Sequence, residues 1–257
     1  MPECEVPSGG RMAWEETGRG DPPLILVHGW CCDRGFLAPQ QAALAATRRV
    51  IAVDLPGHGA SEAPRRDYGV PALAADVAWL CDRLALERPV LIGHSLGGAV
   101  AIQLAVDRPQ QVAAVVALDT TLGPGLEIRR AWAALVEDLA GPDFRAAARA
   151  AIERLYFSPT DDAARRARIL AAMTARPQHV MHDVFAGIAA WDSDAAVAAL
   201  RVPFLHIARS AGGTDHAHLR RLCPQAMTAR VVGSGHFITL EVPEQVNAMI
   251  ARFLALA

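Results

Sequence analysis

The sequence predicts an α/β fold: a mostly parallel central sheet flanked by helices, with a helical insertion. Two observations predict the sheet: short apolar runs alternate with amphipathic stretches at helical spacing, and a glycine-rich turn joins one such run to a helix. A third observation, the loss of this alternation between residues 122 and 200, predicts the insertion. A chain of 257 residues is long enough to bury a large core in one such domain.

The expected strands are continuous apolar runs, which are typical of strands covered on both faces of a parallel sheet. They occupy residues 24–27, 50–53, 90–92, 112–118, 204–208 and 229–232, and residues 11–15 predict a weaker opening hairpin. Between them, amphipathic patterns predict helices over residues 40–46, 70–86, 99–107 and 244–256. Strands that alternate with helices in this way build a parallel sheet with crossover helices.

Residues 122–200 hold several helical stretches and no strand-like run. These stretches are separated by breaks at residues 141–143, 158–160 and 176–177, each of which contains a proline. One crossover connection needs far fewer residues than this segment has. We therefore expect residues 1–121 and 201–257 to form the core, and residues 122–200 to form a helical cap over the carboxyl edge of the strands.

Composition and charge narrow the class of protein. The formal net charge is −2, so we expect neither nucleic acid nor an anionic membrane surface as a partner. The five cysteines are odd in number and show no Cys-x-x-Cys spacing, so we expect no disulfide framework, metal or other cofactor. The chain opens without a basic and apolar leader, and no apolar run is long enough for a membrane span. A cytoplasmic location is the expectation.

The segment from Gly93 to Gly97 is the most informative in the chain. It reads Gly-His-Ser-Leu-Gly between an apolar strand and an alanine-rich helix, the setting that a nucleophile elbow requires. Only small residues fit two positions before and after the serine of such a tight turn. Ser95 is therefore the candidate nucleophile, at a helix N-terminus that favours an oxyanion.

A serine hydroxyl needs a neighbouring base, and His236 is the candidate among nine histidines. It follows the last expected strand within Gly-Ser-Gly-His-Phe, and a loop there returns to the strand ends where Ser95 lies. The position of His94 within the turn suggests that its side chain points away from the chemistry.

An oxyanion needs at least two N–H donors that are fixed before the reaction. The first candidate is the amide of Leu96, directly after the nucleophile. The second is the amide of Trp30, which follows the expected strand 24–27 within His-Gly-Trp. The ring of Trp30 is then a candidate wall of the acyl pocket, and Trp191 from the expected cap is a second candidate for binding substrate.

These motifs together resemble those of the α/β-hydrolase fold family. The similarity extends over nearly the whole chain and includes His28-Gly29-Trp30, the segment from Asp54 to Ser61, the elbow at 93–98, and Gly235-His236. The resemblance implies a triad of serine, acid and histidine with Ser95 and His236 in two of the places. The segment from Asp54 to Ser61 is a structural turn in that family and is assigned no chemistry.

The acid departs from the commonest pattern of the family, in which an aspartate follows the first strand after the cap. Here that strand, 204–208, is followed by Arg209, and an aspartate arrives only at Asp215, directly before a helical run that it would suit as an N-cap. The alternative is Asp119, which ends the preceding strand at the same edge of the sheet. Both remain candidates, and Asp119 is favoured.

The leading functional hypothesis is a serine hydrolase that cleaves carboxylic esters, including lactones, through an acyl-enzyme intermediate. A second hypothesis comes from the resemblance of the His-Gly-Trp-Cys loop, and of an acid after the same strand, to cofactor-free dioxygenases of the hydroxy-oxoquinoline type. A third is a receptor of the same fold that binds a small molecule without turning it over. Oxygen uptake and sustained product release distinguish the three.

Overall fold

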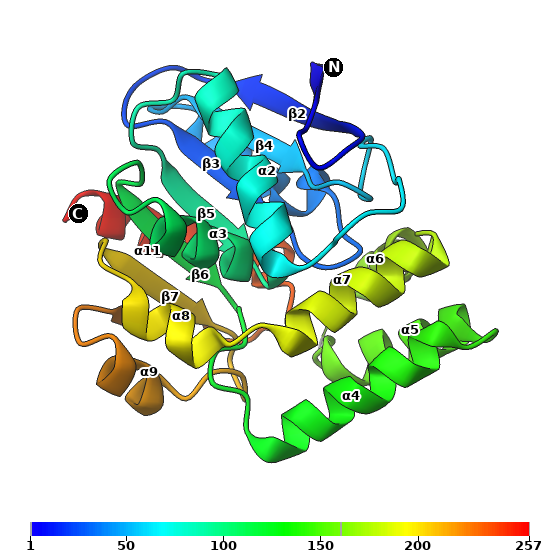
Figure 1. Ribbon diagram of the computed structural model, residues 1–257. Coiled ribbons are helices and arrows are strands. Elements are labelled where there is room, and N and C mark those ends of the chain that lie inside the picture. Colours follow the sequence, from blue (N-terminus) through cyan, green and yellow to red (C-terminus); the bar gives the residue numbers. More distant parts are fainter. Residues whose placement is uncertain (1, 160, 257) are drawn as a thin grey trace.

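An eight-stranded sheet lies at the centre of the computed structural model, which describes residues 2–159 and 161–256 (Figure 1). The strand order is β1-β2-β4-β3-β5-β6-β7-β8. Strands β1 and β2 are antiparallel to their neighbours, and β3 to β8 run parallel. The strands are β1 (Glu3–Glu5), β2 (Arg11–Thr17), β3 (Leu24–Val27), β4 (Val50–Asp54), β5 (Val90–His94), β6 (Ala114–Leu118), β7 (Phe204–Ala208) and β8 (Met227–Arg230).

Helices follow most of the parallel strands and cover both faces of the sheet. Those near the N-terminus are a 3-10 turn (Arg34–Leu37), α1 (Ala38–Leu44), α2 (Val70–Arg83) and α3 (Leu96–Asp107). The middle of the chain forms α4 (Leu126–Ala140), α5 (Phe144–Leu155), α6 (Ala163–Thr174), α7 (Gln178–Ala190) and α8 (Ser193–Ala199). The last are α9 (His216–Leu222), α10 (Ile238–Glu241) and α11 (Pro243–Leu254).

Alternate side chains of each strand enter two separate apolar clusters. Leu24 and Leu26 of β3 pack on the face covered by α1 and α11, whereas Ile25 and Val27 pack on the face covered by α2 and α3. All four are fully buried. Successive side chains of a strand point to opposite faces, so a strand covered on both faces must be apolar throughout. This requirement explains why the central strands read as continuous apolar runs.

The middle of the chain contains α4 to α8 and, within residues 122–159 and 161–200, no strand. Helices α4 to α7 lie together beyond one end of the sheet (Figure 1), where α4 packs against both α5 and α7. Helix α8 packs instead against α3, next to the sheet. The segment therefore reaches from the strand ends back onto one face of the sheet.

Most predicted elements are confirmed, but several of their ends are wrong and one strand was missed. Strands 24–27 and 204–208 are found as predicted, whereas the last strand was expected over 229–232 and lies two residues earlier, at β8. Val232, which the prediction included, is 75% exposed. Strand β1 was not predicted, because two of its three residues are glutamates. Helix α3 begins at Leu96, directly after Ser95, and not at residue 99.

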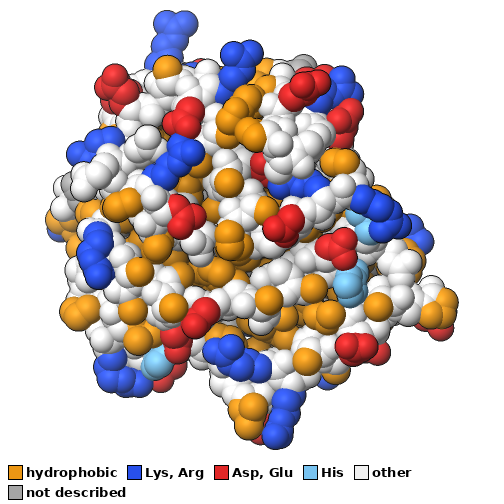
Figure 2. Space-filling model, in the orientation of Figure 1, with side chains coloured by type: hydrophobic (Ala, Val, Ile, Leu, Met, Phe, Trp, Pro, Cys, Tyr) orange, Lys and Arg blue, Asp and Glu red, His pale blue; other side chains and the backbone are white. Residues whose placement is uncertain are grey.

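Two further observations concern the helices and the surface. None of the helices built from the described residues is both long and apolar enough to span a bilayer. On the face shown in Figure 2, acidic and basic side chains are interspersed, and apolar side chains gather in the hollow where α4 to α7 meet the rest of the molecule.

Candidate active site

Ser95 occupies a strained turn between β5 and α3. Its φ and ψ are 53° and −116°, a left-handed conformation that non-glycine residues rarely adopt. The flanking glycines make the turn possible: a Cβ on Gly93 would lie 2.0 Å from the carbonyl oxygen of Gly97, and a Cβ on Gly97 would lie 2.0 Å from that of Val27. The turn leaves the Ser95 side chain on the wall of a cavity.

His236 lies in the loop before α10, and hydrogen bonds fix the backbone of this loop on several sides. Its N–H donates to the carbonyl oxygen of Tyr156 at 2.7 Å. The amides on either side of it, those of Gly235 and Phe237, donate to the carboxylate of Glu241 at 2.7 and 3.0 Å. The loop that carries His236 is therefore held both by Glu241 of α10 and by the end of α5.

Asp119 is the carboxylate that contacts His236. Its Oδ2 lies 2.6 Å from Nδ1 of His236, and both side chains are about 95% buried or more. Asp119 directly follows β6 with a φ of 45°, another left-handed conformation. The other candidate, Asp215, is exposed, and its side chain accepts a hydrogen bond from the N–H of Ala217 as the N-cap of α9. The structure thus brings Asp119, and not Asp215, to the histidine.

Charges around the pair favour an ionised acid and a neutral base. Burial would raise the pKa of Asp119, but the hydrogen bond from His236 and the charges of His236 and Arg209 lower it to about 2. Burial lowers the pKa of His236, an effect that the Asp119 carboxylate offsets only in part. At neutral pH the imidazole is therefore unprotonated and can accept a proton at Nε2.

For a reaction in which His236 accepts the proton of Ser95, this shift predicts a pH dependence. Protonated His236 cannot accept the serine proton, so kcat/KM is expected to fall in acid with a midpoint below about 6.5, the ordinary pKa of histidine. The Asp119→Asn variant loses the group that raises the histidine pKa, so its residual activity is expected to fall at a still lower pH. Initial rates from about pH 4 to 9 measure both midpoints. A wild-type midpoint at or above about 7 would contradict the assignment of His236 as a buried base.

The loop after β3 lies against Ser95. A Cβ built on Gly29 would lie 3.1 Å from Nδ1 of His94 and 3.3 Å from the Cβ of Ser95, so glycine lets this backbone approach closely without a tight contact. The amides of Trp30 and Leu96 flank this contact, and no backbone acceptor is assigned to either among the described residues. Two free N–H groups next to a serine are the donors that an oxyanion requires.

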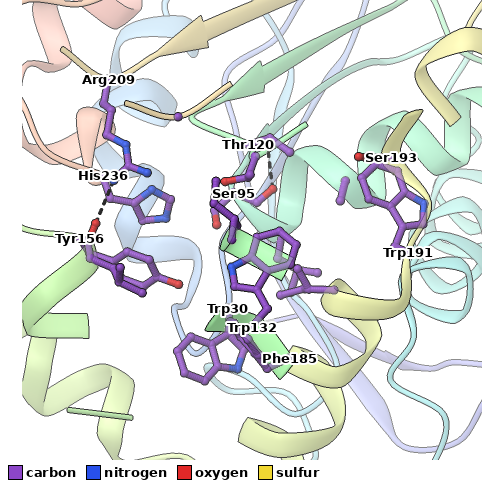
Figure 3. A pocket seen from close by; sticks show the side chains of 17 residues that line it. Trp30, Ser95, Thr120, Trp132, Tyr156, Phe185, Trp191, Ser193, Arg209 and His236 are labelled. Carbon is purple, nitrogen blue, oxygen red and sulfur yellow. Dashed lines mark hydrogen bonds between the residues drawn. The ribbon is translucent and has the colours of Figure 1, made fainter. Parts of the chain in front are cut away.

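Aromatic side chains dominate one wall of the cavity. The Trp30 indole packs 5.0 Å from the Phe185 ring, and its Nε1 donates to the carbonyl oxygen of Met181 in α7. Trp191 lines the same cavity, with its Nε1 bonded to Gln103. Figure 3 shows Trp30, Trp132 and Phe185 together, Trp191 beyond Ser95, and Arg209, His236 and Tyr156 on the other side. The predicted residues Trp30, Ser95, Leu96, Trp191 and His236 all line this one cavity.

The side chains of Ser95 and His236, the candidate nucleophile and base, are not hydrogen-bonded in this structure. Among the described residues no hydrogen bond involves the Ser95 hydroxyl, although Ser95 and His236 share the cavity wall. Catalytic hydrogen bonds are often long before substrate binds. Thr120 contributes instead to the turn, because its hydroxyl donates to the carbonyl oxygen of Ser95 at 3.0 Å.

The expectation for His94 was wrong. Its ring lies 4.7 Å from that of His236, and its Nε2 bonds to the His236 carbonyl oxygen at 2.9 Å. Burial lowers the pKa of His94 to about 3, so the ring is neutral and donates from Nε2. Tyr156, Glu241 and Arg209 also contact this site and were not predicted from the sequence. Of these three, only Arg209 could have been noticed in the sequence, because it directly follows strand 204–208, where the acid turn of the family usually begins.

The comparisons with known proteins agree with this architecture. A family model described as alpha/beta hydrolase fold matches residues 22–196, more than half of the chain. The chain belongs to the α/β-hydrolase fold family. A thermophilic esterase from Thermogutta terrifontis resembles this α/β hydrolase with a TM-score of 0.87 and 25% identity, covering 99% of this chain and 98% of the other.

Two relatives match this α/β hydrolase along most of its length. A pimeloyl-[acyl-carrier protein] methyl ester esterase from Yersinia pseudotuberculosis is 28% identical over 95% of this chain and 97% of its own. The dihydrolipoyllysine-residue acetyltransferase component of an acetoin cleaving system from Pseudomonas putida is 29% identical over 96% of this chain and 67% of its own. Some other curated relatives match over only 30% to 34% of their own length.

Proposed function

We propose that this α/β hydrolase cleaves carboxylic esters, including lactones, with Ser95 as nucleophile, His236 as base and Asp119 as the orienting acid. The observation that carries the proposal is the 2.6 Å contact between Asp119 and Nδ1 of His236, which leaves Nε2 facing the chemistry. Esterases among the relatives and structural neighbours support the same class of reaction.

In the proposed first step, His236 Nε2 takes the hydroxyl proton of Ser95 as the oxygen attacks the carbonyl carbon. The tetrahedral oxyanion then accepts hydrogen bonds from the amides of Trp30 and Leu96. When it collapses, the bond to the leaving oxygen breaks and His236 returns the proton to that oxygen, which releases an alcohol. Water repeats the sequence on the acyl-enzyme and releases the carboxylic acid.

Asp119 acts through the histidine in this scheme. Its carboxylate accepts a hydrogen bond from Nδ1–H of His236, so the imidazole keeps the tautomer in which Nε2 carries no proton. The negative charge of the carboxylate also stabilises the imidazolium that forms transiently. The low pKa of Asp119 keeps the carboxylate ionised throughout, so it orients the base and does not exchange protons with it.

The size of the cavity limits the length of the acyl group, because the same cavity also has to hold part of the leaving group. Its volume is about 160 Å³, close to the roughly 150 Å³ that holds one benzene molecule in an engineered protein cavity. Each CH₂ buried against the aromatic wall contributes about 0.8 kcal/mol, or roughly fourfold in kcat/KM. We therefore expect kcat/KM to rise along 4-nitrophenyl acetate, propanoate and butanoate, and to stop rising before decanoate.

This panel of esters tests the proposed function as a whole. The same assay with Ser95→Ala supplies the background rate. Hydrolysis of no member above that background would contradict the proposal, and a continued rise to dodecanoate would contradict the assignment of the aromatic wall as the acyl site.

The second candidate function is a cofactor-free ring-cleaving dioxygenase, and one observation favours it. The contact of His236 with an acid after β6 is the arrangement that the resemblance to those enzymes implied. In that reaction the histidine would deprotonate an aromatic substrate, and Ser95 would form no covalent bond. Oxygen consumption with a hydroxy-oxoquinoline, and no labelling of Ser95 by an acylating reagent, would favour this candidate. A receptor would show neither oxygen consumption nor sustained product release.

A further inference from the structure

Arg209 is the only side chain with a permanent charge among the described residues that line the cavity. It directly follows β7, and its side chain is 20% exposed. Its partner Asp119 does not line the cavity and is only 2% exposed, so the carboxylate lies behind the cavity wall. A molecule in the cavity therefore meets the positive charge of the guanidinium before the negative charge of the acid.

Some N–H groups of Arg209 already have acceptors within the protein, and others do not. Its backbone N–H donates to Oδ1 of Asp119 at 3.0 Å, whereas its Nε lies 3.3 Å from Oδ2 in an ion pair and forms no hydrogen bond with the described residues. One terminal nitrogen, Nη1, donates to the carbonyl oxygen of Leu155 at 2.9 Å. No acceptor for Nη2 is found in the described part of the chain. Gly213 lines the cavity beside Nε and has no side chain to cover the guanidinium.

Tyr156 places a second donor on the same side. Its ring stacks on His236, with 4.3 Å between centroids and 27° between planes, and its hydroxyl points into the cavity towards Ser95 and Trp30 (Figure 3). No hydrogen-bond partner of this hydroxyl is found among the described residues. Burial raises the pKa of Tyr156, so the hydroxyl keeps its proton and can donate it in a hydrogen bond.

The position of the base decides which half of a substrate meets these donors. His236 protonates the leaving oxygen, so the alcohol half of an ester lies on the side of His236. That side holds Arg209 and Tyr156, whereas Trp30, Trp132 and Phe185 lie on a separate wall (Figure 3). We infer that the alcohol half of the substrate carries a carboxylate, which binds the Arg209 guanidinium and the Tyr156 hydroxyl, while the acyl half is apolar. The inference rests on the proposed function, because the role of His236 in that reaction decides which part of the cavity holds the alcohol half and which holds the acyl half.

A matched set of esters tests the inference. 3-Carboxyphenyl acetate and 3-carbamoylphenyl acetate differ in the charge of the leaving group and little in its size. Wild-type enzyme is expected to prefer the carboxylate by about tenfold or more in kcat/KM, the effect of one hydrogen bond between charged groups. In Arg209→Gln this ratio is expected to fall to near one, and in Arg209→Lys most of it is expected to remain.

The ratio separates binding of the leaving group from the other contacts of Arg209. Loss of its contact with Asp119 slows both esters alike and cancels in the ratio. Arg220→Gln removes an equal charge from a site outside the cavity lining and is expected to leave the ratio unchanged. Tyr156→Phe keeps the ring on His236 and is expected to lower the ratio by a few fold. Monomethyl succinate and methyl succinamate move the charge to the acyl half, where no preference for the carboxylate is expected.

Product binding decides the inference even if no ester turns over. The affinity of 3-hydroxybenzoate, measured by calorimetry, is expected to exceed that of 3-hydroxybenzamide in wild type and to lose this advantage in Arg209→Gln. Hydrolysis without a preference for the anionic leaving group would overturn this inference and leave the proposed function standing. Failure to hydrolyse any ester, with the preference for 3-hydroxybenzoate intact, would overturn the proposed function alone.

Discussion

Replacing Ser95 by alanine is expected to lower kcat for ester hydrolysis by about six orders of magnitude, as loss of the serine does in a serine protease. The residual rate would come from the oxyanion donors and from binding, which the substitution leaves in place. Alanine keeps the Cβ of serine, and no described residue hydrogen-bonds to the Ser95 hydroxyl, so the fold is expected to survive. Turnover of 4-nitrophenyl acetate and thermal unfolding of both proteins measure the two effects.

Ser234→Ala is the matched control for that variant. Its hydroxyl is buried two residues from His236, has no hydrogen-bond partner in the described structure, and does not line the cavity. Its kcat is expected to stay within a few fold of wild type. If Ser95→Ala kept a substantial part of the wild-type kcat, Ser95 would not be the nucleophile.

Replacing Asp119 by asparagine is expected to lower kcat by about 10⁴, the cost of losing the orienting carboxylate in a serine protease. Asparagine has nearly the same shape, and its oxygen can still accept the N–H of Arg209. It carries no charge to stabilise the imidazolium, and its amide favours the wrong tautomer of His236. The loss is therefore expected in kcat and much less in KM.

Asp215→Asn provides the comparison for Asp119→Asn. Asparagine is as good an N-cap as aspartate, so this variant is expected to keep both kcat and the melting temperature of wild type. Both variants are assayed on one ester at one pH, with melting temperatures recorded alongside. A large loss of kcat in Asp215→Asn, with Asp119→Asn active, would move the acid to Asp215.

Local chemistry explains what could be predicted from the sequence. The central strands are apolar on both faces, so β3 and β7 were predicted with their observed bounds. The turn at Ser95 needs glycine at positions 93 and 97, which leaves a motif that can be read without a structure. Strand β8 was misplaced because it lies at the sheet edge, where pairing with β7 and not apolar composition sets its ends.

The contacts that orient His236 could not be predicted, because they join distant segments. Tyr156 comes from the end of α5 and stacks on a histidine 80 residues later in the chain. His94 looked remote because an elbow turns successive side chains apart, yet the loop of His236 folds back onto its ring. The choice between Asp119 and Asp215 also depended on tertiary structure, since both follow strands that end at the same edge.

The most direct test of a Ser95 nucleophile is the site at which a fluorophosphonate reacts. Trypsin releases residues 84–129 as one peptide, because Arg88 and Arg108 each precede a proline. Ser95 is the only serine in it, no tyrosine, cysteine or lysine is present, and fragmentation separates Ser95 from the two threonines at 120 and 121. A serine activated by His236 would displace fluoride from the reagent, so mass spectrometry should find the adduct on this peptide in wild type and no labelling of Ser95→Ala. An adduct on another peptide, or equal labelling of Ser95→Ala, would contradict the assignment of Ser95 as the nucleophile.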